Sequence, residues 1–151
     1  MSYVHLVMVI SFVAWFTAQT LKVVGGVIRD KRLDLRFFVR SGGTPSAHAA
    51  LVTSLATAIG VLEGFNSVLF AFAMVFAGVV MYDAAGVRQS VSKQSVILNR
   101  LLQELMEKRP KDIQNDVREL IGHTPFQVFT GGLLGASIAL VWLLIIGDLR
   151  F

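Results

Sequence analysis

The chain alternates four apolar blocks with segments that carry most of its charge. The blocks occupy residues 3–21, 47–62, 68–87 and 126–146. The first and last reach the roughly 20 apolar residues that a helix needs to cross the hydrocarbon core of a bilayer. The pattern therefore predicts an all-α fold: an integral membrane bundle of about four transmembrane helices, forming a single membrane domain over residues 1–151.

The second block is the least certain of the four spans. It is short and carries Thr53, Ser54 and Thr57, so taken alone it is also compatible with a buried helix or a re-entrant segment. The following residues 63–66 (EGFN) form a natural turn toward the third block. This turn favours a fourth span.

The region between the last two blocks contains a different apolar repeat. Leucine and methionine residues recur at helical spacing within residues 91–121, interrupted at Pro110 and closed at Gly122. The spacing predicts amphipathic helices that lie at the membrane surface or pack against the bundle. A solvated linker with an apolar stripe is the alternative.

Composition agrees with a membrane protein, because 54% of the 151 residues are hydrophobic and only 16% are charged. The net charge of +4 does not indicate a nucleic-acid partner, because the basic residues flank apolar spans instead of forming a stripe with interleaved aromatic residues. The chain has no cysteine, which excludes disulfides and thiolate metal sites. Neither a metal nor a cofactor is expected.

The basic residues also predict a topology. With four spans, segments 22–44 and 88–125 share one side of the membrane, and every lysine and arginine except Arg150 falls in them. Because lysine and arginine in short loops stay in the cytoplasm, these segments are expected to face the cytoplasm and both termini to face outward. The expected location is the plasma membrane of a bacterium.

Two segments on the basic side begin helices in a similar way. Residues 44–48 (TPSAH) and 123–126 (HTPF) each offer a threonine as N-cap and a proline as the first helical residue. Two helix N-termini beside Gly42 and Gly43 would form a binding site for an anion. Each feature alone has a plainer explanation, since Thr-Pro is ordinary helix capping and a single interfacial histidine is usually structural.

The candidate chemistry gathers on this side. His48 and His123 lie within one turn of the two helix starts, and the cations Lys22, Arg29, Arg40 and Arg88 lie on the same side. Asp83, at the end of the third block, either pairs with a cation such as Arg88 or orients a histidine. The third histidine, His5, lies across the membrane and is expected to be structural.

These segments resemble a known family of membrane phosphatases. Residues 40–48 (RSGGTPSAH), 82–88 (YDAAGVR) and 122–125 (GHTP) are similar to signatures of a divergent bacterial and plastid branch of the type-2 phosphatidic acid phosphatase and vanadium haloperoxidase superfamily. Lys22 and Arg29 fit the superfamily's first motif, for which Arg40 is a competing candidate. Gln127 occupies a position where the superfamily has an aspartate.

The resemblance implies a lipid phosphatase acting on a phosphomonoester or diphosphate lipid, of the phosphatidic acid or polyprenyl phosphate type. In that role His123 would form a phosphohistidine and His48 would serve as general acid and base. The phosphate would be bound by Lys22, Arg29, Arg40, Arg88 and the backbone around Gly43 and Ser46. Asp83 and Gln127 would be the orienting residues.

Two other functions fit the sequence. Because glutamine cannot replace an anionic partner of histidine, the protein could bind or transport a phosphorylated lipid without catalysis. It could also be a structural partner in a larger membrane complex. Gly131, Gly135 and Ala139 form a small-xxx-small pattern that suits contacts within the chain or between subunits. A homo-oligomer is expected, because four spans are few for enclosing a lipid head group.

Overall fold

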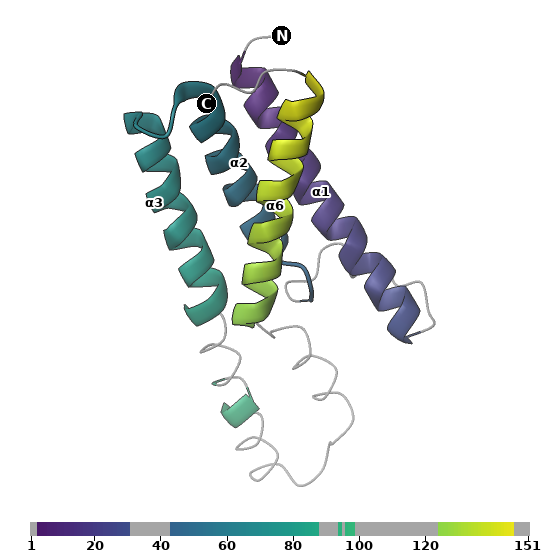
Figure 1. Cartoon of the computed structure of the whole chain (residues 1–151). Coiled ribbons are helices and arrows are strands. Elements are labelled where there is room, and N and C mark those ends of the chain that lie inside the picture. Colours follow the sequence, from purple (N-terminus) through teal and green to yellow (C-terminus); the bar gives the residue numbers. More distant parts are fainter. Residues whose placement is uncertain (1–2, 31–42, 88–93, 95, 99–123, 147–151) are drawn as a thin grey trace, which may run out of the picture.

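The computed structural model describes residues 3–30, 43–87, 94, 96–98 and 124–146, and its regular elements there are helical (Figure 1). They are α1 (Tyr3–Asp30), α2 (Ala47–Glu63), α3 (Val68–Tyr82), the π-helical turn η2 (Asp83–Val87) and α6 (Pro125–Ile146). The predicted all-α membrane bundle is thereby confirmed. Most of the amphipathic segment 91–121 lies outside the described residues, so that prediction stays open.

Three helices in the described part of the chain are long and apolar enough to cross a membrane, over Tyr3–Ile28, Val68–Gly86 and Pro125–Ile146. Helix α2 is shorter. Its 17 residues extend about 26 Å, a little less than the roughly 30 Å of a hydrocarbon core. Helix α1 has 28 residues and continues past the first apolar block into the basic segment.

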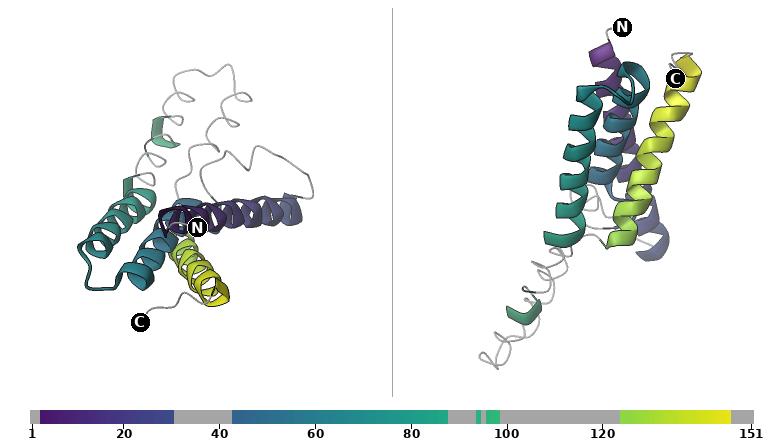
Figure 2. Two further views of the ribbon diagram at one scale, coloured as in Figure 1. Left: turned by 90° about the horizontal axis from the view of Figure 1, so that it is seen from above. Right: turned by 60° about the vertical axis from the view of Figure 1, so that its left-hand side comes forward.

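Helix α2 is the centre of the bundle. It contacts α1, α3 and α6, and α1 and α3 lie on opposite sides of it (Figures 1 and 2). Its buried residues are mostly small, among them Ala49, Ala50, Ala56 and Ala58. By contrast, α3 buries only Ala73 and Ala77 and exposes most of its larger apolar side chains, as expected for a peripheral helix surrounded by lipid.

Helices α2 and α6 approach each other closely through glycine. A methyl group at Gly135 would overlap the carbonyl oxygen of Ala50 and the hydroxyl of Thr53. The Thr53 hydroxyl donates a hydrogen bond to the Gly132 carbonyl oxygen at 3.0 Å. The small-xxx-small pattern of α6 therefore serves a contact within the chain, one of the two alternatives that the sequence left open.

The ends of the helices separate the two sides of the bundle. The start of α1, the end of α6 and the turn between α2 and α3 lie at one end (Figure 1). The end of α1, η2 and the start of α6 lie at the other. The turn is packed, because the rings of Phe65 and Phe70 meet edge to face with centroids 5.2 Å apart.

Candidate functional site

The starts of α2 and α6 touch each other. The backbone N–H of Ser46 donates a hydrogen bond to the backbone carbonyl oxygen of Gln127 at 2.9 Å. A methyl group at Gly131 would overlap the Ser46 carbonyl oxygen, so only glycine permits this approach. The two segments chosen from the sequence as paired helix starts are thus adjacent in space. The start of α2 lies about one turn, on the order of 5 Å, further into the bundle than the start of α6.

At the start of α2 the predicted N-cap is wrong by two residues. The cap is Ser46, not Thr44, and the first helical residue is Ala47, not Pro45. Ser46 has an extended backbone, and its hydroxyl accepts a hydrogen bond from the Ala49 N–H at 3.4 Å. The physical reason is the bond to α6, which holds Ser46 in the extended conformation of an N-cap.

At the start of α6 the prediction is correct. Pro125 is the first helical residue, and the Thr124 hydroxyl accepts a hydrogen bond from the Gln127 N–H at 3.3 Å. In return, the Gln127 side-chain oxygen accepts a hydrogen bond from the Thr124 N–H at 3.0 Å. This reciprocal pair is a capping box, which satisfies two backbone donors at the helix start.

Lys22 reaches this region from α1. Its side chain passes directly beside Gly43, since a Cβ atom at Gly43 would lie 2.9 Å from Lys22 Cγ and 3.2 Å from Lys22 Cδ. Gly43 has a positive φ of 92°, which other residues rarely adopt. Lys22 is only 6% exposed. No ion pair joins it to a carboxylate in the part of the chain that the structure describes.

A buried lysine in a membrane helix is costly unless something compensates its charge. The Lys22 side chain, which carries the ammonium group, runs along Gly43. Gly43 lies three residues before the α2 N-cap. An N-terminus presents partly positive backbone donors, so it does not compensate the lysine. This arrangement of positive groups favours a bound anion.

The π-helical turn η2 brings Asp83 to the same end of the bundle. Ala84 of the turn packs with Ala49 of α2 and Val128 of α6 in one buried cluster. Asp83 and His48 are both exposed, and each immediately precedes a member of this cluster along the chain. Both side chains therefore belong to neighbouring elements at the rim of the two helix starts.

The structure thus places Lys22 beside Gly43 and Ser46 beside Gln127, with His48 two residues after Ser46 and Asp83 on the turn that packs against both helix starts. Arg40, Arg88 and His123 lie outside the described residues, as does the side chain of Arg29. Within the described ranges, no group of three or more histidine, aspartate or glutamate side chains could hold a metal ion.

One polar residue on α1 was missed at the sequence level. Gln19 is 8% exposed and precedes Lys22 by three residues, so the two share one face of the helix. The sequence contains a signal for Gln19, because an amide side chain within a membrane helix is energetically costly and uncommon. Gln19 extends the polar stripe of α1 by one turn from Lys22.

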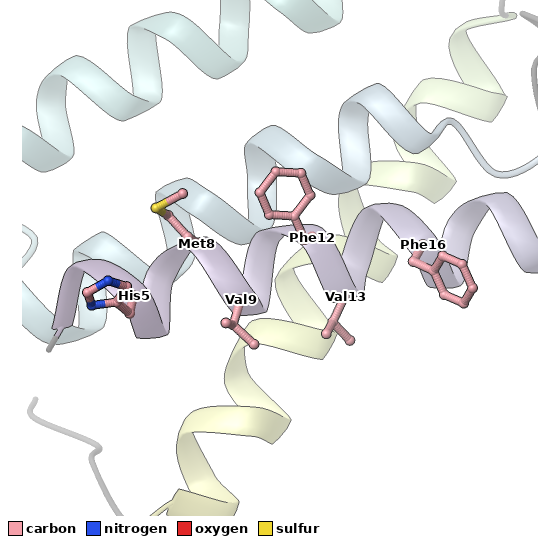
Figure 3. Close-up of a pocket in the computed structure, with 6 residues that line it drawn as sticks. All are labelled: His5, Met8, Val9, Phe12, Val13 and Phe16. Carbon is pink, nitrogen blue, oxygen red and sulfur yellow. The ribbon is translucent and has the colours of Figure 1, made fainter. Parts of the chain in front are cut away.

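A separate hollow of about 470 Å³ lies along the first half of α1, away from the two helix starts (Figure 3). Its lining side chains all come from α1 and are almost entirely apolar. They are His5, Met8, Val9, Phe12, Val13 and Phe16. A surface of this kind suits contact with apolar groups.

Comparison with known proteins agrees with the motifs. Residues 4–138 match the model of a family described as the divergent PAP2 family. A relative from Bacillus subtilis (strain 168), named uncharacterized membrane protein YuiD, is 36% identical over 141 aligned positions, which cover 87% of this chain and 89% of the relative. No solved structure matches the chain significantly.

Proposed function

Because the chain belongs to the divergent PAP2 family, a family of membrane proteins, we propose that it is a membrane lipid phosphatase. The proposed substrate is a phosphomonoester or diphosphate lipid of the phosphatidic acid or polyprenyl phosphate type. The proposed reaction proceeds through a phosphohistidine and releases inorganic phosphate.

The observation that carries this proposal is the buried Lys22 beside Gly43 at the start of α2. Burial of the Lys22 side chain desolvates part of its ammonium group, and a nearby phosphate group would offset this cost through charge-assisted hydrogen bonds. The α2 start adds backbone donors. The N–H groups of Ser46 and Ala49 are occupied by Gln127 and by the Ser46 hydroxyl, which leaves the Ala47 N–H as a donor for phosphate oxygen.

The chemical roles follow the family resemblance. A ring nitrogen of His123 attacks phosphorus, and the bond between phosphorus and the lipid oxygen breaks while His48 donates a proton to that oxygen. In the second step His48 takes a proton from water, which attacks the phosphohistidine and releases phosphate. Arg29, Arg40 and Arg88 would join Lys22 in stabilising the charge on the phosphoryl oxygens.

The position of the site suits a lipid. The start of α2 lies inside the bundle, so a phosphate bound there can keep its attached hydrocarbon chains among the membrane helices. We propose that the protein resides in the plasma membrane of a bacterium, with the site facing the cytoplasm. Support for this orientation comes from the concentration of lysine and arginine in the segments next to the site.

A second candidate function is binding or transport of a phosphorylated lipid without hydrolysis. It is favoured by Gln127, whose side-chain oxygen accepts a hydrogen bond from its own helix start and whose amide carries no charge. A catalytic imidazole that lacks an anionic partner is a weaker nucleophile. This candidate predicts saturable lipid binding that depends on Lys22, without release of phosphate.

Phosphate release from lipid vesicles tests the proposal. The purified protein is reconstituted with phosphatidic acid or a polyprenyl phosphate, and released phosphate is measured for wild type, His48→Ala and His5→Ala. The last variant is a matched control, because His5 lies near the start of α1, at the end of the bundle away from the candidate site. We expect His48→Ala to lose about 100-fold or more in rate and His5→Ala to retain it. Absence of phosphate release from both lipids, or full activity in His48→Ala, contradicts the proposal.

A further inference from the structure

Gln127 takes part in four hydrogen bonds among the described residues, three within the start of α6 and one to the start of α2. Its side-chain oxygen and its backbone N–H bond to the Thr124 backbone and hydroxyl, at 3.0 and 3.3 Å. Its backbone carbonyl oxygen accepts from the Ser46 N–H at 2.9 Å and from the Thr130 hydroxyl at 3.1 Å. The side chain therefore orders the first turn of α6, and the same residue's carbonyl group contacts the N-cap of α2.

The capping of α6 by the Gln127 side chain and the contact of the Gln127 carbonyl oxygen with Ser46 depend on each other. Without the capping box, the first turn of α6 loses the bond between Thr124 and the side chain and can fray. Fraying displaces the Gln127 carbonyl oxygen, which is the acceptor for Ser46. The close packing of Gly131 on Ser46 leaves little room for a rearrangement that would restore the contact.

We propose that Gln127 is a positioning residue, which sets the start of α2, and with it His48 two residues after Ser46, in register with the start of α6. The inference rests on the proposed phosphatase function. It also gives a physical reason for glutamine at this position, because the third helical position of a capping box is occupied by glutamate or glutamine. In this role Gln127 acts through the backbone of the two helix starts.

The test compares Gln127→Ala and Gln127→Glu with Leu133→Ala, a control at an exposed position of α6. Two quantities are measured: kcat and KM for phosphatidic acid, and the hydrogen-exchange rate of the Ser46 amide by NMR. We expect Gln127→Ala to lower kcat about 10- to 100-fold with KM within about threefold, because misplacement of a catalytic group affects the chemical step. Ser46 exchange should accelerate about tenfold, as expected for a lost hydrogen bond.

Gln127→Glu should restore most of the lost kcat and the slow exchange, because glutamate forms the same capping box. An unchanged kcat in Gln127→Ala, unchanged Ser46 exchange, or a Gln127→Glu variant as impaired as Gln127→Ala would overturn the inference. A wild type that hydrolyses no lipid, combined with fast Ser46 exchange in Gln127→Ala alone, would contradict the phosphatase and still support the coupling of the helix starts.

Discussion

Replacing Gly131 with alanine should separate the starts of α2 and α6, whereas the same replacement at the adjacent Gly132 should be tolerated. At Gly131 the new methyl group would overlap the Ser46 carbonyl oxygen and lie 2.9 Å from the Ser46 nitrogen. At Gly132 it would lie 3.5 Å from Met81 Cε and from Thr53 Cγ2, which is ordinary van der Waals contact. The two neighbouring glycines therefore provide a matched pair.

The magnitude follows from three contributions. Overpacking against a backbone costs about 1–3 kcal/mol, and loss of the bond from Ser46 to Gln127 adds about 1 kcal/mol. Alanine stabilises the helix by about 1 kcal/mol relative to glycine through its higher helix propensity. Gly131→Ala should thus lower the free energy of unfolding by about 2 kcal/mol, and Gly132→Ala should raise it by up to about 1 kcal/mol.

Reversible unfolding of the detergent-solubilised protein, followed by circular dichroism in mixed micelles, measures both variants against wild type. We expect a difference of about 3 kcal/mol between them, with Gly131→Ala the less stable. Equal stabilities, or a less stable Gly132→Ala, would refute the described packing of α6 on α2.

Three further predictions concern the site and the topology. Lys22→Met should weaken binding of lipid phosphate by about 30-fold or more, as judged by vesicle binding, yet leave the ligand-free protein at least as stable in thermal unfolding, because it removes a partly desolvated charge that has no carboxylate partner among the described residues; undiminished binding would contradict this. Gly43→Ala should lower stability by about 1–2 kcal/mol because of its positive φ, and should raise KM by crowding Lys22, so an unchanged KM would count against the placement of that side chain. A reporter fused after Phe151 should be found outside the cytoplasm, and a cytoplasmic reporter would reverse the proposed orientation.

Much of the fold was predictable from the apolar blocks, because a membrane helix must satisfy its own backbone hydrogen bonds along its length. The start of α6 was equally clear, since Thr124 and Pro125 provide a complete local capping signal. The start of α2 was predicted at Thr44 but lies at Ser46, because its position depends on a bond from another helix. Local capping rules do not include such a partner.

The candidate site was predictable in composition but not in arrangement. The sequence placed Lys22 and the helix starts on one side of the membrane, yet it gave no indication that Lys22 is buried against Gly43. Gln127 is expected from the sequence to orient a histidine, and this stays a prediction; among the described residues it forms hydrogen bonds with Thr124, Ser46 and Thr130. Those contacts depend on tertiary packing that residue spacing does not specify.

Trapping of a phosphorylated intermediate tests the central claim most directly. The reconstituted protein is mixed with a lipid labelled with ³²P in its phosphate group and quenched in alkali, which preserves phosphohistidine. The labelled residue is then located by mass spectrometry. We predict label on His123 in wild type, accumulation of that label in His48→Ala if the second step is slowed more than the first, and no label in His123→Ala. Turnover without any protein-bound phosphate, or label that persists in His123→Ala, would contradict the proposed mechanism.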